Sequence, residues 1–379
     1  MSSNNSCNVV NPKECDTCKS RKEPLIHISK RTNISTGKAW SIRAIALVLA
    51  LVVSGLVIFL IVKLSPLKIY AAMFNGAFGT SKRAWATIRD SMMMLCIGVG
   101  LAPAFKMKFW NIGAEGQILM GGIATAFCMI YFGKTMSSPL LFLVMIIASI
   151  LAGGLWGLIP GVFKAKWNTN ETLFTLMMNY VAIQLTSYCV SKWESPPGSN
   201  SVGIINQSTR AGWFPSLFGQ AYMLNVIIVL TLAVLMFVYL KYSKQGYEIS
   251  VVGDSENTAR YAGMNVKKIY IRTMALSGAI CGIAGFLAVS GASHTISVST
   301  AGGRGFTAII VAWLAKFNTF VMILISFLLI FLEKGAIEIA SRYNLNDYAS
   351  SIITGIILFF ILGSEFFINY KVNFCRKHN

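Results

Sequence analysis

The sequence is poor in charged residues, and in acidic residues most of all. Charged residues make up 12% of its 379 residues, and 14 Asp and Glu stand against 33 Lys and Arg. About a quarter of the residues of an ordinary soluble domain are charged. Because 55% of the residues are also hydrophobic, this composition excludes a water-soluble globule and indicates a membrane protein. Basic cytoplasmic loops facing anionic lipid explain the net charge of +19, so we expect no nucleic acid partner.

Patterns for redox, metal or nucleotide chemistry are also missing. Cys15 and Cys18 form a lone C-x-x-C without a second pair or a nearby His at metal-ligand spacing, which disfavours a zinc or redox site. Gly133-Lys-Thr ends like a phosphate-binding loop, but Cys128 replaces the first glycine of that motif. His294 has no partners for a catalytic triad or a metal site. The sequence therefore predicts no catalytic residues, no metal site and no cofactor.

The apolar sequence predicts an all-α polytopic membrane protein with about ten transmembrane or re-entrant helices, since a span takes about 20 residues. The first span, 44–62, is uncharged. Further predicted spans are 85–105, 109–131, 139–163, 171–191, 221–240, 272–292 and 349–369.

The remaining apolar stretch, 305–332, is long for one helix and is interrupted by polar residues that include Lys316 and Asn318. It is interpreted as two segments, 305–315 and 317–332, that meet at a polar turn. Without this division the number of segments is nine.

Basic residues set the predicted orientation. Eight Lys and Arg precede the first span against three acidic residues, which places the N-terminus in the cytoplasm. Residues 1–43 contain no apolar signal-peptide core and are interpreted as a disordered, basic cytoplasmic tail. Residues 44–370 form the transmembrane domain, and residues 371–379 form a second cytoplasmic tail when the number of segments is ten. An external loop is expected over 192–220 and a cytoplasmic loop over 241–272.

The cytoplasmic loop contains a predicted surface helix over 255–262. Capping, pairing and helix-ending residues mark it: Asp254, Ser255, Glu256, Arg260 and Gly263. A helix of two turns is unstable in isolation. It is either a solvated turn or an element that docks against a cytoplasmic partner.

Polar residues also cluster at the start of the segment 109–131, namely Asn111, Glu115 and Gln117 beside Gly113 and Gly116. An ionisable residue at membrane depth indicates a functional site. The alternative is structural, with Glu115 capping a half-helix or pairing with a nearby Lys.

The span 171–191 has polar residues at a spacing of four, Glu171, Thr175 and Asn179, which share one helix face. This face either lines something polar or forms hydrogen bonds to neighbouring helices.

Several of these stretches resemble a known family. Residues 109–119, FWNIGAEGQIL, closely resemble the F-N-I-G-x-E-G-Q signature of permease subunits of bacterial ABC importers, in the family of branched-chain amino acid, ribose and nucleoside permeases. Residues 246–253, 259–264 and 277–285 are similar to that family's cytoplasmic coupling loop and the small-residue helix after it. Residues 305–312 resemble a third block. Residues 170–180, NETLFTLMMNY, most resemble the nucleoside branch.

The resemblance implies a multi-pass permease in a bacterial cell membrane, a transport subunit and not an enzyme. Its implied partners are an ABC ATPase subunit, a second and related permease in a heterodimer, an extracellular substrate-binding lipoprotein and a small-molecule substrate, here a nucleoside. The implied substrate-path residues are Asn111, Glu115, Gln117, Thr175 and Asn179. The implied ATPase-coupling residues are Gly253, Asp254, Ser255, Glu256, Ala259, Arg260 and Gly263.

Two alternatives to this function remain. The chain could be an ABC permease for simple sugars or branched-chain amino acids. It could also be an ion-coupled secondary transporter or channel, in which Glu115 carries a proton or binds a cation. A membrane enzyme is disfavoured, because no nucleophile, metal cluster or carboxylate pair is visible in the sequence.

Overall fold

The computed structural model describes residues 26–30, 35–62, 66–217 and 219–343, together with scattered positions between 352 and 374. The chain forms two compact units, one of residues 55–354 and one of residues 1–54 with 355–379.

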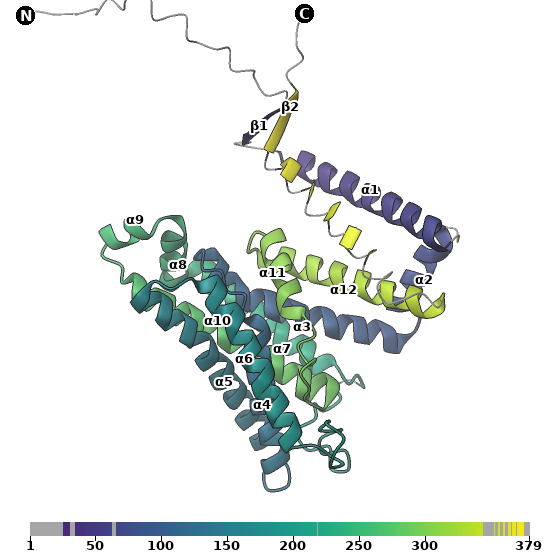
Figure 1. The fold of residues 1–379 in the computed structure, drawn as a ribbon, viewed down its shortest axis with the longest axis vertical. Helices are drawn as coiled ribbons and strands as arrows, with labels where there is room; N and C mark the ends of the chain where they lie inside the picture. Colours follow the sequence, from purple (N-terminus) through teal and green to yellow (C-terminus); the bar gives the residue numbers. More distant parts are fainter. Residues whose placement is uncertain are drawn as a thin grey trace, which may run out of the picture. The chain divides into compact units, whose positions relative to one another are not determined.

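The regular elements described in the larger unit are helices, joined by turns and loops (Figure 1). Its helices are α2 (Pro66–Phe78), α3 (Ser81–Lys106), α4 (Ala114–Phe132), α5 (Ser138–Trp167), α6 (Glu171–Lys192), α7 (Met223–Tyr242), α8 (Lys244–Asp254), α9 (Glu256–Tyr261), α10 (Val266–Ala288), α11 (Arg304–Leu314) and α12 (Thr319–Arg342). A π-helical turn, Val289–Ser293, continues α10. In the described part of the chain, seven helices are long and apolar enough to cross a membrane, namely α3, α4, α5, α6, α7, α10 and α12. The prediction of an all-α polytopic membrane protein is confirmed for the larger unit.

Helix α10 lies at the centre of the larger unit and packs against α3, α4 and α5. Glycines allow its backbone to touch that of α5. A Cβ atom on Gly153 would lie 2.4 Å from the carbonyl oxygen of Gly278, and one on Gly282 would lie 2.2 Å from that of Ser149. Small residues of this kind permit the close helix packing that is common in membranes. The packing holds the start of α4 against α10, where the polar residues discussed below lie.

The division of 305–332 into two segments is confirmed. Helix α11 ends at Leu314 and α12 begins at Thr319. The turn between them contains two residues with left-handed backbone, Lys316 (φ 49°) and Phe317 (φ 61°). Asn318 then caps α12 by accepting a hydrogen bond from the N–H of Phe320 at 3.1 Å.

Helix α12 extends to Arg342, ten residues beyond the predicted end at 332. The apolar criterion ended the segment there because charged residues follow, but the structure pairs these residues within the larger unit. Lys334 contacts Asp90 at 2.7 Å and Glu338 contacts Arg83 at 3.1 Å.

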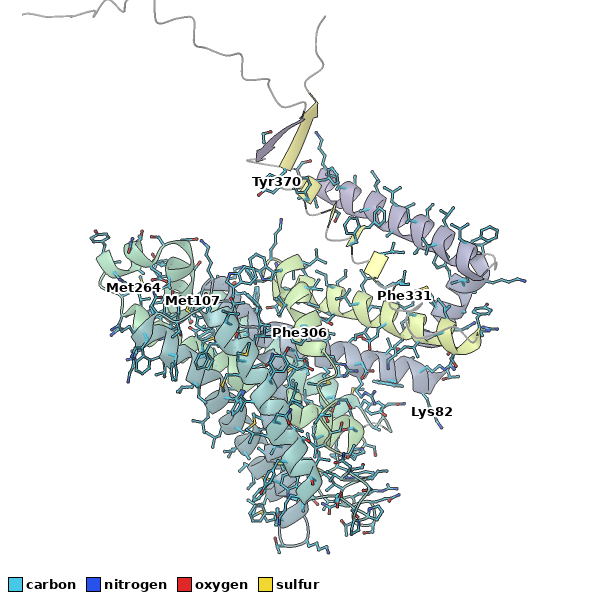
Figure 2. The ribbon with its side chains drawn as sticks, in the orientation of Figure 1. Lys82, Met107, Met264, Phe306, Phe331 and Tyr370 are labelled. Atoms are coloured by element: carbon cyan, nitrogen blue, oxygen red, sulfur yellow. The ribbon has the colours of Figure 1, made fainter. Side chains whose placement is uncertain are left out.

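The cytoplasmic loop predicted over 241–272 contains two helices where one was predicted. Helix α9 confirms the short helix, and Ser255 caps it by accepting a hydrogen bond from the N–H of Thr258 at 3.3 Å. Gly263 follows α9 with φ 75°, the left-handed conformation that suits a helix-ending glycine. Asp254 is the last residue of α8 and does not cap α9, so its predicted capping role is wrong. Met107, after α3, and Met264, after α9, mark the end of the larger unit at which α8 and α9 lie (Figure 2).

The smaller unit contains a two-stranded antiparallel sheet. Strand β1 (Ile26–Lys30) pairs with β2 (Tyr370–Phe374), and Ile26 lies opposite Phe374. Helix α1 (Thr36–Val62) begins eight residues before the predicted first span. Strand β1 and the start of α1 thus lie within the predicted tail 1–43, while β2 begins at Tyr370, the last residue of the predicted transmembrane domain, and continues into the predicted tail 371–379. Cys15, Cys18 and most of the predicted span 349–369 lie outside the described residues.

Candidate functional site

The segment 107–113 interrupts the helical structure between α3 and α4. Lys108 has left-handed backbone with φ 58°, and α4 begins at Ala114 and not at residue 109 as predicted. Backbone outside helices at membrane depth needs hydrogen-bond partners within the protein. Two side chains of α6 supply them.

Thr175 and Asn179 are those side chains. The Oγ1 atom of Thr175 accepts a hydrogen bond from the N–H of Ile112 at 3.1 Å. Asn179 donates through Nδ2 to the carbonyl of Ile112 at 2.9 Å and accepts through Oδ1 from the N–H of Gly116 at 2.8 Å. Of the two interpretations of this helix face, the structure therefore shows hydrogen bonding between segments. Glu171, the third residue of the pattern, pairs with Lys164 at 3.0 Å.

Asn111 connects the same interruption to α10. Its Oδ1 accepts from the N–H of Gly113 at 2.9 Å, and its Nδ2 donates to Oγ of Ser277 at 3.1 Å. The amide of Gln117 lies next to it, with Nδ2 of Asn111 at 3.5 Å from Oε1 of Gln117.

Glu115 caps helix α11. Its Oε1 accepts a hydrogen bond from the N–H of Gly303 at 2.7 Å, and its Oε2 accepts one from the N–H of Gly305 at 2.9 Å. A carboxylate at a helix N-terminus is favoured by the unpaired N–H groups and the helix dipole. Helix α11 has only 11 residues, so the structural alternative, in which Glu115 caps a half-helix, describes the contact observed.

The structure thus brings together all five predicted path residues, which we call the polar junction: Asn111, Glu115, Gln117, Thr175 and Asn179. Each is buried, and Glu115 is the most accessible at 7% exposure. Their observed hydrogen bonds are made within the protein, to backbone groups and to neighbouring side chains. The polar junction joins α4, α6, α10 and α11 at the interruption.

The predicted coupling residues lie beside this interruption. A cavity of about 170 Å³ is lined by Met107, Lys108 and Phe109 on one side and by four coupling residues, Gly253, Asp254, Ser255 and Glu256, on the other. The contact between the two sides is close, because a Cβ atom on Gly253 would lie 2.1 Å from the carbonyl oxygen of Lys106.

Helix α9 has a buried side and an exposed side, and the coupling residues Ala259 and Arg260 lie on opposite sides. Ala259 is fully buried, and Glu256 accepts a hydrogen bond from the hydroxyl of Tyr270. Arg260 is 65% exposed as a side chain, and Tyr261 is 93% exposed. Helix α9 therefore presents Arg260 and Tyr261 outward while Ala259 and Glu256 attach it to the larger unit.

A cluster of charged residues was missed by the sequence analysis. Asp90, on α3, is 1% exposed. It lies 2.9 Å from Arg89, 2.7 Å from Lys334 on α12 and 3.5 Å from Arg304 at the start of α11. We call these four residues the Asp90 cluster. The sequence feature that could have indicated this cluster is Asp90 itself, the single acidic residue within the predicted span 85–105.

His294, for which no catalytic role is predicted, organises the loop after α10. Its ring stacks on Trp213 with centroids 3.9 Å apart, and its carbonyl accepts a hydrogen bond from the N–H of Ile205 at 2.9 Å. Burial lowers the pKa of His294, and the positive charge of Arg89 adds to this effect. The contacts are those of a packing residue.

Several apolar helices, a polar interruption held by buried side chains and a charge cluster between helices define a polytopic membrane protein. The chain belongs to the family of branched-chain amino acid transport system permease components, which matches residues 84–362.

Three relatives illustrate the range of this similarity. The guanosine ABC transporter permease protein NupP of Bacillus subtilis is 32% identical over 326 residues, 84% of this chain and 92% of the relative. The nucleoside ABC transporter permease protein NupB of Lactococcus lactis is 25% identical, over 81% of this chain and 86% of the relative. The glucose ABC transporter permease protein TsgB13 of Haloferax volcanii is 25% identical, over 93% of this chain and 96% of the relative.

We predict that Asp90→Asn destabilises the protein strongly, because three cations then lose the carboxylate that they share. Removing one partner of a buried ion pair costs about 3 kcal/mol or more. The melting temperature of the detergent-solubilised protein should fall, and adding Lys334→Met should restore part of the loss. Glu338→Gln, which breaks the more exposed pair with Arg83, is the matched control and should cost less than about 1 kcal/mol. Equal losses in Asp90→Asn and Glu338→Gln would contradict this account of the cluster.

Proposed function

We propose that this protein is the membrane-spanning subunit of an ATP-driven importer of nucleosides in a bacterial cell membrane. The assignment of nucleosides as the substrate class is based on the similarity to two permeases named for guanosine and nucleosides, each over more than 80% of this chain. Residues 170–180, which resemble the nucleoside branch, form the first half of α6, beside the polar junction.

We propose that ATP hydrolysis takes place in a separate ATPase subunit that docks on α8 and α9. Arg260 and Tyr261 are exposed on α9 for such a contact. Movement of α8 would reach the interruption directly, since Gly253 lies against the carbonyl of Lys106. The ATPase subunit lies in the cytoplasm, so α8 and α9 face the cytoplasm in this proposal. Both termini of the chain are then cytoplasmic as well. A related second permease completes the path as a heterodimer, and an external lipoprotein delivers the substrate.

In this proposal the polar junction gates the path. Its hydrogen-bonding groups are engaged within the protein, so they hold α4, α6 and α11 in one arrangement. An alternating-access transporter switches between discrete packings of its helices. Movement of α8 against the interruption 107–113 would change the arrangement of the helices that the polar junction joins.

Two other functions compete with this one. The glucose permease relative keeps a simple sugar as a second candidate substrate. An ion-coupled carrier is less well supported, because both oxygens of Glu115, its candidate ion-binding group, accept backbone hydrogen bonds.

The substrate class is tested by competition in cells or vesicles that contain the complete transporter. Uptake of labelled guanosine should be nearly abolished by excess unlabelled guanosine or uridine, and it should be unaffected by leucine. An ATP-driven importer should also keep its activity when an uncoupler is added at constant ATP. Competition by glucose or ribose, with none by nucleosides, would overturn the assignment.

The role of α9 is tested at Gly263. A β-branched residue with φ near 75° strains the backbone by about 1–3 kcal/mol, whereas Asn tolerates this conformation. Apart from the two neighbouring residues of the chain, no atom lies within 4 Å of a Cβ at this position, so the Cβ itself meets open space and the strain arises from the backbone conformation. We expect Gly263→Val to reduce uptake about 10-fold or more at normal membrane abundance, and Gly263→Asn to retain uptake. Normal uptake in Gly263→Val would contradict coupling through this helix.

A further inference from the structure

Helix α6 differs from other spans in what it exposes. The exposed mid-helix residues of α5 and α12 are apolar, for example Leu151 (56%), Leu155 (62%) and Leu324 (56%). Such faces suit contact with lipid. In contrast, next to the exposed apolar residues Val181 and Leu185, α6 exposes Tyr180, Gln184, Ser187 and Tyr188 along one side of its second half. We call these four residues the α6 stripe.

The α6 stripe is separate from the polar junction, although α6 contributes to both. Thr175 and Asn179 are buried against the interruption before α4. Tyr180 and Tyr188, in contrast, are 59% and 69% exposed. Residues at i, i+4, i+7 and i+8 share one side of a helix, so the stripe is a continuous surface about 12 Å long.

Contact with lipid is energetically unfavourable for the α6 stripe. Within the described residues no hydrogen bond is observed for the amide of Gln184, which is exposed. A carboxamide without a partner is costly in hydrocarbon, and polar side chains within spans therefore face other helices or a water-filled space. Among the described elements, α6 packs mainly against α4 and α5, which leaves the stripe open on its outer side.

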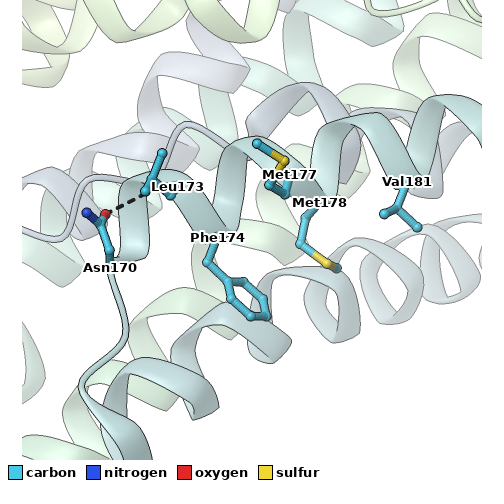
Figure 3. A pocket seen from close by; sticks show the side chains of 6 residues that line it. All are labelled: Asn170, Leu173, Phe174, Met177, Met178 and Val181. Carbon is cyan, nitrogen blue, oxygen red and sulfur yellow. Dashed lines mark hydrogen bonds between the residues drawn. The ribbon is translucent and has the colours of Figure 1, made fainter.

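A groove adjoins the stripe along the same helix. It has a volume of about 300 Å³ and is lined by Asn170, Leu173, Phe174, Met177, Met178 and Val181, which follow one another along α6 (Figure 3). Val181 and Gln184 are three residues apart in α6 and are therefore neighbours on the helix surface. Apolar side chains next to a few hydrogen-bonding groups match the composition, though not the depth, of small-molecule sites.

We propose that the α6 stripe is a wall of the solute path and recognises the base of a nucleoside, with Gln184 as the main specificity-determining residue. This inference rests on the proposed function. A carboxamide has one acceptor and two donors, which match the hydrogen-bonding edge of a nucleobase. The phenol rings of Tyr180 and Tyr188 offer flat surfaces against which a base can stack. The stripe carries no charge, in agreement with an uncharged solute.

The position of the stripe is tested by water access, which does not depend on the substrate. In the assembled transporter, with its native cysteines replaced, Gln184→Cys should react with a hydrophilic methanethiosulfonate reagent. Leu151→Cys, on the exposed apolar face of α5, is the matched control and should react at least 10-fold more slowly. Equal and slow labelling at both positions would overturn the inference, because the stripe would then face lipid or protein.

Recognition of the base is tested by uptake and by protection. Gln184→Leu should raise the apparent KM for guanosine about 10-fold, because a hydrogen bond to the base is lost, while Leu151→Met should leave it unchanged. Guanosine should slow the labelling of Gln184→Cys. An unchanged KM, or loss of the partner subunits from purified Gln184→Leu transporter, would overturn the assignment, the latter in favour of a subunit interface. Protection by glucose and not by guanosine would place the stripe in the path but refute the nucleoside function.

Discussion

The structure depends on how the backbone N–H and C=O groups that lie outside helices find hydrogen-bond partners in the interior of the protein. Two segments with such groups, the interruption before α4 and the start of α11, meet at Glu115. Its carboxylate accepts hydrogen bonds from the N–H groups of Gly303 and Gly305 at 2.7 and 2.9 Å. On the other side of the same helix start, the amide of Asn179 bonds to Ile112 and Gly116. A buried backbone group that is left unpaired costs about 1–3 kcal/mol, so these hydrogen bonds stabilise the junction. The polar junction therefore determines where α4 and α11 begin.

Helix α11 is held at its first turn from two sides. Glu115 binds its backbone, and Arg304 places its guanidinium 3.5 Å from Asp90 on α3. Lys334 brings α12 to the same carboxylate. The short helix can therefore move only with the helices around it or by breaking charged contacts.

Apolar length and polar interruptions were sufficient to predict most of the fold. The polar turn around Lys316 and Asn318 correctly divided α11 from α12, and the capping pattern at Ser255 correctly predicted α9. The end of α12 was predicted too early, because the charge of Lys334 is neutralised by a residue far away in the sequence. Local patterns do not contain such pairings, and for the same reason the importance of Asp90 was missed.

The sequence predicted which residues form the candidate site, but it did not predict which way their helix face points. The spacing of Thr175 and Asn179 correctly placed them on one face of α6, yet the direction of that face depends on how the helix rotates against α4. The structure turns this face inward and leaves Gln184 exposed on another side.

Amide hydrogen exchange at residues 303–305 tests the central claim most directly. If the carboxylate of Glu115 holds the start of α11, exchange at these amides should be slowest in the wild-type protein, faster in Glu115→Gln and fastest in Glu115→Leu, while α10 is unaffected. Identical exchange at 303–305 in all three proteins would contradict the account.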